Sequence, residues 1–365
     1  MLKNLACGSA RALAAILAVG AAFALQAQTP TGPPLKVGFV YVSPVGEAGW
    51  TYQHDQGRRE MERALGTRVQ TSVVESVAEG PDAERVLRDL AAQGHGLIFA
   101  TSFGYLEPAL RVAAQYPSVR FEHAGGYRTA TNLNTYNARY YEARYLAGLL
   151  AGKSSKRGVA GYVAGFPVPE VMQGINAFAI GLREANPKAE LRVLWLNTWF
   201  DPGREREAAL TLINQGADVL TNHSASAAVA QTAQEKRVMF IGYQSDMRKF
   251  APDVQLAAVT HHWGGYYTGV AQAVLDGTYR PQPVWAGMKE GLVQLSALRA
   301  NLAPAVRNLI ETRRKAIEAG SFMPFSAPLV DNQGRTRLAQ GALDDAQIGA
   351  MDWFVQGVVG TLPKP

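Results

Sequence analysis

This sequence of 365 residues contains a single cysteine, Cys7. Cys7 lies in the first 27 residues, where the basic Lys3 and Arg11 precede an uncharged apolar run, 12–25. The run is short for a membrane span, and the segment Leu25-Gln26-Ala27 at its end suits cleavage by a signal peptidase. A lipid-anchored cysteine would follow the apolar run, whereas Cys7 precedes it, so we expect a soluble exported protein. Its mature chain would lack cysteine, which excludes disulfides and thiolate metal ligands.

The sequence also lacks a concentration of charge. Charged residues make up 18% of the chain, and the formal net charge of +6 falls to +4 if Lys3 and Arg11 leave with the leader. The basic residues are scattered, whereas nucleic-acid binding needs a concentrated basic patch. We therefore expect no nucleic-acid partner. A hydrophobic content of 47% suits a globular protein with large cores, and the length suits two domains.

Motifs of common enzyme and metal sites are missing as well. The sequence has no G-x-S-x-G, Walker, G-x-G-x-x-G or H-E-x-x-H motif. His261 and His262 are adjacent, but in an extended segment neighbouring side chains point to opposite faces and cannot readily chelate one ion. We therefore expect no catalytic residue, no metal and no cofactor.

The sequence contains the same segment, with similar flanking patterns, twice. Residues 91–102 align with residues 213–224, and each copy follows a strand-like run and a charged helical stretch. Each copy also precedes a helix rich in small residues and another short apolar strand. Continuous apolar runs such as Leu35–Val42 are typical of buried parallel strands. The repeat predicts an α/β protein with two doubly wound, Rossmann-like lobes and a ligand cleft at the carboxyl ends of their strands.

Aromatic and polar residues stand at those predicted carboxyl ends. Trp50 follows the first strand in a Gly-rich loop, and Trp199 ends a strand of the second lobe, so the two indoles could clamp a flat ring. Packing in a core is the alternative for both. The polar residues could read the edge of the ring, although each alone could be a turn or a helix cap. The expected ligand-binding residues are Trp50, Thr51, Thr101, Ser102, Phe103, Phe166, Trp199, Asn222, His223, Gln244, Asp246 and His261.

The order of several short segments resembles the basic membrane protein family of solute-binding proteins, which serve ABC importers. These segments are Lys36-Val37-Gly38-Phe39, Gly49-Trp50-Thr51-Tyr52-Gln53, Tyr145-Leu146-Ala147-Gly148, Gly174–Gly181, Trp199-Phe200-Asp201-Pro202, Asn214–Val219 and Gly287–Gly291. The resemblance covers nearly the whole mature chain and implies the type I periplasmic binding fold. We expect lobe 1 to hold residues 28–138 and 264–288, and lobe 2 to hold 139–263 and 289–365. Three chain crossings, near Asn137, His261 and Gly287, would form the hinge.

Members of this family bind purine nucleosides between two aromatics, which match Trp50 and Trp199. Where they carry an aspartate and a lysine for the ribose, this chain has Gln244 and His261, and a further family aspartate falls among residues 123–126. The resemblance therefore implies a monomeric periplasmic protein that binds a free purine base, adenine or a near relative, and serves an ABC permease.

Three alternatives stay open at this point. The first is a purine nucleoside as the ligand, and the second is a receptor that reports to a membrane sensor kinase. The third is a secreted enzyme acting on purines, for which only Glu122, His123 and Asp246 are candidate residues.

Overall fold

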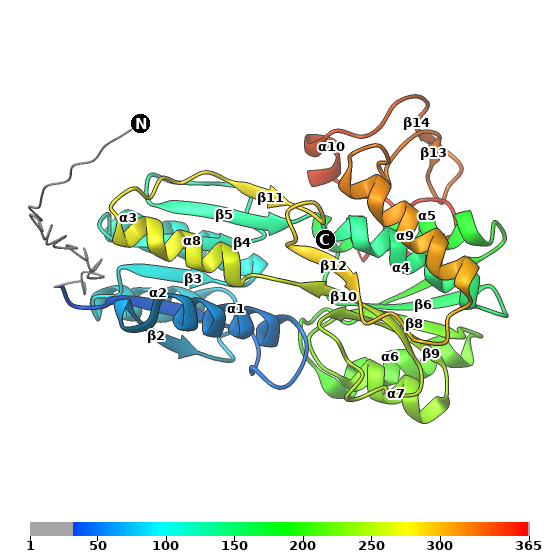
Figure 1. Ribbon diagram of the computed structural model, residues 1–365, viewed down its shortest axis with the longest axis horizontal. Helices are drawn as coiled ribbons and strands as arrows, with labels where there is room; N and C mark the ends of the chain where they lie inside the picture. The colour runs from blue at the N-terminus through cyan, green and yellow to red at the C-terminus, as the bar shows by residue number, and fades with distance from the viewer. Residues whose placement is uncertain (1–31, 364–365) are drawn as a thin grey trace, which may run out of the picture. The chain divides into compact units, whose positions relative to one another are not determined.

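The computed structural model of the protein describes residues 32–363, so the expected leader and its cleavage site lie outside the described residues. Within 32–363 the chain forms a sheet of six strands, a sheet of seven strands and a small two-stranded sheet, with helices packed on the two large sheets (Figure 1). None of the helices in this range combines the length and apolarity needed to cross a bilayer.

The first sheet is parallel at every pairing of its strands. In sheet order its strands are β11 (Val284–Ala286), β5 (Leu133–Ala138), β4 (Arg120–Ala124), β3 (Leu97–Ala100), β1 (Leu35–Val40) and β2 (Val69–Val74). Its helices are α1 (Trp50–Leu65), α2 (Pro81–Ala92), α3 (Leu106–Gln115) and α8 (Gly264–Leu275), with short 3₁₀ turns at Gly66–Arg68 and Phe103–Tyr105.

Strand β1 shows why this sheet carries helices on both faces. Successive side chains of a strand point to opposite faces. Phe39 packs against Tyr267 of α8 with ring centroids 5.3 Å apart, whereas Val40 joins a separate buried cluster with Leu87 and Leu90 of α2. A strand buried on both faces reads as a continuous apolar run, which is the pattern seen in the sequence.

The second sheet repeats this plan and is parallel except where β12 pairs with β10. In sheet order its strands are β12 (Val293–Ser296), β10 (Gln255–His261), β9 (Met239–Gln244), β8 (Val219–His223), β6 (Val159–Ala164), β7 (Glu190–Trp195) and β15 (Val358–Val359). Its helices are α4 (Tyr140–Ser154), α5 (Pro169–Ala185), α6 (Pro202–Asn214), α7 (Ala228–Lys236), α9 (Pro304–Glu318) and α10 (Asp345–Gly349). A hairpin of β13 (Leu329–Val330) and β14 (Thr336–Leu338) turns at residues 331–335.

Helices α4 and α5 pack unusually closely. A Cβ on Gly148 would overlap the backbone of Phe178, and a Cβ on Gly181 would overlap the backbone of Tyr145. The glycines therefore let the two helix backbones approach each other. This close pair explains the spacing of small residues in the segments Tyr145–Gly148 and Gly174–Gly181.

The repeated sequence unit occupies the same place in both sheets. Residues 91–102 contain β3, which lies between β1 and β4, and residues 213–224 contain β8, which lies between β6 and β9. The prediction of an α/β protein with two doubly wound sheets is confirmed.

The chain passes from one sheet to the other three times. It leaves the first sheet after Ala138, returns after His261, and leaves again between Ala286 and Val293. These passages lie at the positions where the sequence predicts the three crossings. The division into two lobes that move against each other remains a prediction.

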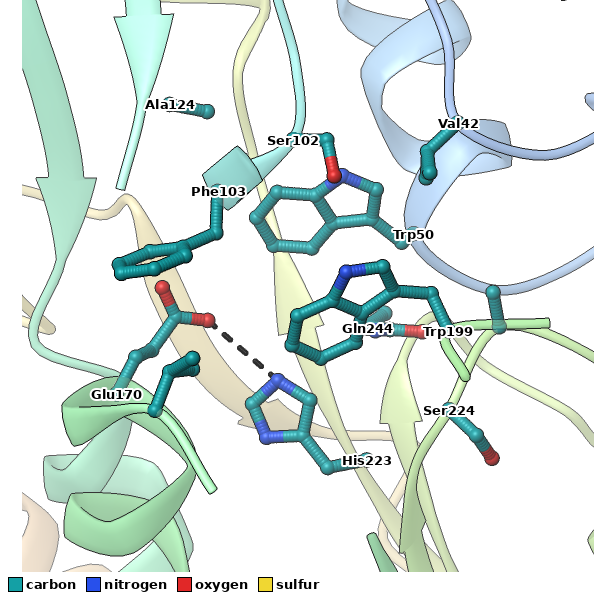
Figure 2. Close-up of a pocket in the computed structure, with 12 residues that line it drawn as sticks. Val42, Trp50, Ser102, Phe103, Ala124, Glu170, Trp199, His223, Ser224 and Gln244 are labelled. Carbon is teal, nitrogen blue, oxygen red and sulfur yellow. Dashed lines mark ion pairs between the residues drawn. The ribbon is translucent and has the colours of Figure 1, made fainter. Parts of the chain in front are cut away.

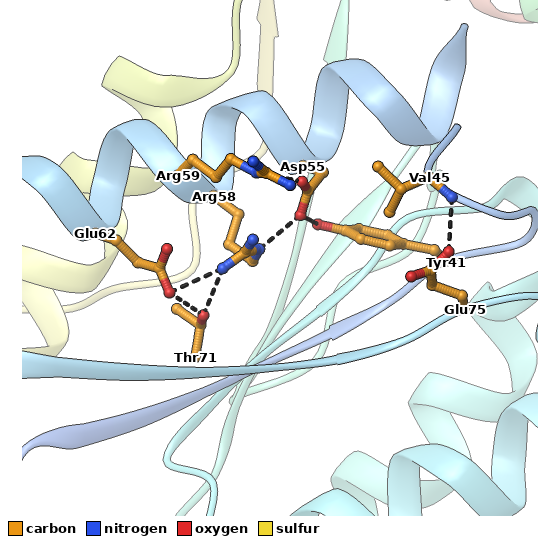
Figure 3. Close-up of polar contacts among 8 residues, drawn as sticks. All are labelled: Tyr41, Val45, Asp55, Arg58, Arg59, Glu62, Thr71 and Glu75. Atoms are coloured by element: carbon orange, nitrogen blue, oxygen red, sulfur yellow. Dashed lines mark hydrogen bonds and ion pairs between the residues drawn. The ribbon is translucent and has the colours of Figure 1, made fainter. Parts of the chain in front are cut away.

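Helix α1, which begins with Trp50, is fixed on the first sheet by a buried carboxylate. Asp55 is 1% exposed and accepts hydrogen bonds of 2.7 Å from the Nε atoms of both Arg58 and Arg59 (Figure 3). Arg58 also donates to Oγ1 of Thr71 on β2 at 2.8 Å. Because this network joins α1 to the sheet, it fixes the place of Trp50 at the start of the helix.

Candidate functional site

A pocket lies at the carboxyl ends of strands from both sheets. In open α/β sheets, small-molecule sites form at these strand ends. The half that contains the first sheet contributes Val42, Trp50, Ser102, Phe103 and Ala124, and the half that contains the second contributes Val168, Glu170, Trp199, His223, Ser224, Ala225 and Gln244 (Figure 2).

Trp50 lines the pocket from the first turn of α1. Its Nε1 donates a hydrogen bond of 2.6 Å to the carbonyl oxygen of Thr101, just after β3. The rings of His54 and His261 pack edge-on against its indole, with centroids 4.4 Å and 6.0 Å away. The indole is thereby held on its polar atom and on its sides, which suits a rigid surface for stacking.

Trp199 lines the pocket from the loop after β7, and in Figure 2 its indole lies below that of Trp50. The ring of Phe166 packs against it at an interplanar angle of 66° with centroids 4.9 Å apart. Gly165 lies so close beneath the indole that a Cβ there would be 2.7 Å from a ring carbon. The Nε1 of Trp199 donates a hydrogen bond of 3.1 Å to Oε1 of Glu79, a residue of the half that contains the first sheet. The second indole is therefore also fixed in one orientation.

The polar end of the pocket is formed by Glu170, His223 and Gln244. Nε2 of His223 lies 3.4 Å from Oε1 of Glu170, and the two side chains are 4% and 13% exposed. Burial lowers the pKa of His223, the positive charge of Arg144 adds to this, and Glu170 opposes it. Gln244 ends β9 with a left-handed backbone, φ +69°, which is uncommon for a residue with a side chain.

Six of the expected ligand-binding residues line this pocket. They are Trp50, Ser102, Phe103, Trp199, His223 and Gln244. Phe166 does not line it but supports Trp199 from behind.

Three further expected residues are buried behind the lining. Thr51 pairs its hydroxyl with that of Ser43 at 2.7 Å, and the hydroxyl of Thr101 donates to the carbonyl of Val40. The amide of Asn222 donates to the carbonyl of Ser224 at 3.0 Å. These three side chains shape the loops that carry the pocket rather than facing it.

Asp246 and His261 do not line the pocket either. The carboxylate of Asp246 accepts hydrogen bonds from Arg248 at 2.8 Å and from Gln255 at 2.7 Å, which turn it toward the surface of the second sheet. His261 is fully buried, tilted against Tyr140 with ring centroids 4.4 Å apart. Its position behind Trp50 follows from the passage of the chain between the two sheets after β10.

The acid and base residues singled out in the sequence do not line the pocket. Glu122 and His123 are fully buried within the first sheet and do not line it. Within residues 32–363 no group of three His, Cys, Asp or Glu side chains is placed to hold a metal ion.

The sequence analysis missed Glu170, which lies in the first turn of α5, directly after Pro169. A signal for it was available. Helix α5 follows β6 as α1 follows β1, so the first turn of α5, which contains Glu170, corresponds to the first turn of α1, which begins with Trp50. Glu79 was missed too, because no local pattern marks a carboxylate that reaches the opposite sheet.

Comparison with known proteins gives a consistent set of relatives. The sequence model of the Bmp family, described as PnrA-like ABC transporter substrate-binding proteins, matches residues 35–324. A purine-binding protein of Brucella abortus (strain 2308) is 47% identical over 350 residues, which cover 96% of this chain and all of that protein. A putative ABC transporter glucose-binding protein of Haloferax volcanii is 34% identical over 333 residues, covering 91% of this chain and 82% of that protein.

Solved structures with the same architecture are more distant in sequence. A solute-binding protein of an ABC transporter system from Aeropyrum pernix K1 superposes with a TM-score of 0.70 at 19% identity, covering 81% of this chain and 94% of that one. A second, from Conexibacter woesei, gives 0.65 at 21% identity, covering 79% and 98%. At these identities the likeness shows the fold alone, which is that of type I periplasmic binding proteins.

Proposed function

Because this chain belongs to the PnrA-like family of ABC transporter substrate-binding proteins, we propose that it binds a free purine base between Trp50 and Trp199 and delivers it to an ABC permease. The observation that carries the proposal is the pair of indoles, one from each half of the protein, that line one pocket. Stacking of a base on an aromatic side chain contributes on the order of 1–3 kcal/mol. A flat heteroaromatic ring is therefore the ligand that this pocket suits best.

The residues at the two ribose positions favour a base over a nucleoside. The strand-end position that carries an aspartate in nucleoside binders is Gln244 here, so a charged partner for ribose hydroxyls is missing there. His261, at the lysine position, is fully buried behind Trp50 and cannot reach a ligand in the pocket as the chain is folded here.

Closure of the two halves would trap the ligand. We infer that residues 28–138 and 264–288 move as lobe 1 and residues 139–263 and 289–365 as lobe 2, with the three passages as the hinge. Contacts between the halves support this closed arrangement. The backbone N–H of Gly49 donates a hydrogen bond of 2.9 Å to Oγ of Ser245, and Lys249 forms an ion pair with Glu47. A ligand that stabilises the closed state would create the surface that a permease recognises.

The site of action would be the periplasm. Residues 1–27 have the pattern of a cleavable leader, and transporter substrate-binding proteins act outside the inner membrane. N-terminal sequencing of the protein recovered from the periplasm should begin at Gln28 or close to it. An acylated Cys7 at the N-terminus would contradict this assignment.

Titration calorimetry with adenine, hypoxanthine, adenosine and glucose tests the ligand. We expect a purine base to bind more tightly than adenosine, and glucose not to compete. Mass spectrometry of the small molecules that co-purify with the protein should find the same base, and incubation with adenosine should leave it unchanged. Binding of glucose without binding of any purine would refute the proposal and favour the ligand named for the Haloferax relative.

A further inference from the structure

The carboxylate of Glu170 lies at the polar end of the pocket and has few interactions with other side chains. It lies beneath the ring of Phe103 in Figure 2, and its one ion-pair partner within residues 32–363 is His223. The separation of 3.4 Å between Oε1 and Nε2 exceeds the usual 2.7–3.2 Å of an N–H···O hydrogen bond. Glu170 therefore keeps acceptor capacity that faces the pocket.

His223 adds a second acceptor. Because burial lowers its pKa, the imidazole is neutral at neutral pH and carries one N–H. The Nε2–H tautomer is favoured because Nε2 faces the carboxylate, and this tautomer leaves Nδ1 as an acceptor. Nδ1 is buried and has no hydrogen-bond partner in the described part of the chain.

Gln244 adds a third acceptor. Its Oε1 is likewise buried and lacks a hydrogen-bond partner among residues 32–363. Buried acceptors are normally satisfied, so the unpaired Nδ1 of His223 and Oε1 of Gln244 mark this end of the pocket as short of hydrogen-bond donors. Glu170, His223 and Gln244 all line the same pocket.

We propose that Glu170 selects purines that present an amino group at the polar end of the pocket over purines that present a carbonyl oxygen there. An amino group such as that of adenine offers two N–H donors to acceptors around it. A carbonyl oxygen in the same place would face the carboxylate without a hydrogen bond and would leave Glu170 unpaired, which is how a polar site rejects a ligand. The proposal rests on purine binding, as proposed above, and adds the residue that determines which purine binds.

A purely structural role for Glu170 is the competing explanation. A carboxylate in the first turn of a helix is stabilised by the helix dipole, and Glu170 is the second residue of α5. Removal of such a carboxylate would lower the stability of the protein and weaken all ligands alike. A change in the ratio of affinities is the effect that only ligand recognition predicts.

The test is Glu170→Gln, which keeps the shape of the side chain and replaces one acceptor oxygen by an amide donor. Calorimetric titrations at pH 7.5 would use adenine, hypoxanthine and unsubstituted purine. We expect the wild type to prefer adenine to hypoxanthine by at least about tenfold. In the variant, adenine should bind about 10- to 100-fold more weakly, the loss expected for a hydrogen bond to a charged group. Hypoxanthine should bind unchanged or more tightly, and purine should change little.

Two further variants complete the test. Glu170→Asp keeps the charge and should keep the preference for adenine, and Glu207→Gln, on the exposed face of α6, should behave as the wild type in both affinity and melting temperature. Equal weakening of all three ligands in Glu170→Gln, or an unchanged preference, would overturn the role of Glu170. Absence of purine binding by the wild type would instead refute the proposed function and with it this inference.

Discussion

Oε1 of Glu79 accepts a hydrogen bond of 3.1 Å from the indole Nε1 of Trp199, although the two residues belong to opposite halves of the protein. The same oxygen accepts from Oγ of Ser102 at 2.6 Å and from the backbone N–H of Gly104 at 2.8 Å. A Cβ at position 104 would overlap the carboxylate of Glu79, so a glycine is needed there for the carboxylate to accept these hydrogen bonds. One carboxylate thus ties an indole of the second half to the loop after β3 in the first.

Removal of this tie should weaken ligand binding. In Glu79→Ala, Trp199 would no longer be held by the first half, and the closed state would lose a hydrogen bond to a charged group. We expect purine affinity to fall about 10- to 100-fold, mainly through faster dissociation, because the bond forms only after closure. Stopped-flow measurement of association and dissociation would show this, with Glu207→Ala as the control on an exposed face. An unchanged dissociation rate would contradict the role of Glu79.

The two indoles should each be necessary for tight binding. Trp50→Ala and Trp199→Ala should weaken purine binding by roughly 1–3 kcal/mol, about 5- to 150-fold. Both residues are only partly buried, so the melting temperature should fall little. Trp195→Ala is the matched control, because Trp195 stacks on Phe354 of the second half and does not line the pocket. If the indoles served the core instead, each truncation would cost about 3–5 kcal/mol of stability and leave the affinity unchanged.

Gly49 should be required for closure. A Cβ there would overlap the carbonyl oxygen of Ala225 in the opposite half, and its φ of +93° disfavours any side chain. Gly49→Ala should therefore hold the halves apart and weaken purine binding about 5- to 150-fold, given a strain of about 1–3 kcal/mol. Gly46→Ala separates the two causes, because Gly46 also has positive φ, +56°, but has open space around it. Equal affinity loss in both variants would mean that loop strain, and not the contact across the halves, is responsible.

Glu122 should make stability depend on pH. It is fully buried in the first sheet, and burial raises its pKa from about 4.5 to about 7, against hydrogen bonds from Tyr266, Tyr279 and Asn134. Between these two values the folded state holds more protons than the unfolded state, so the free energy of unfolding falls as pH rises. The protonated Glu122 therefore adds to the free energy of unfolding, relative to its value at about pH 8. This stabilisation is present in full below pH 4.5, is lost by about pH 8, and amounts to as much as about 3 kcal/mol.

The variant Glu122→Gln should remove that dependence. A glutamine does not titrate, and its amide could donate to Oδ1 of Asn134, which is buried without a partner in the described part of the chain. Urea unfolding at pH 5 and pH 8 should show a smaller loss of stability across this range in the variant than in the wild type. Parallel curves for the two proteins would show that Glu122 does not titrate in this range.

The sequence by itself determined the fold class and the two tryptophans that line the pocket. Continuous apolar runs predict parallel strands because they are buried on both faces, and a repeated unit predicts two similar sheets, since both signals are local in the chain. Trp50 and Trp199 could be found for the same reason. Each follows a predicted strand, and the carboxyl ends of parallel strands gather at one edge of the sheet.

The tertiary structure decided what those strand ends do. Asp246 and Gln244 are two residues apart, yet hydrogen bonds to Arg248 and Gln255 turn Asp246 away while Gln244 lines the pocket. Glu79 meets Trp199 only because the halves are packed together, and their separation of 120 residues in the chain carries no local signal. Sequence periodicity fixes which strand a residue ends, whereas the direction of its side chain and the group that it meets depend on packing between elements far apart in the chain.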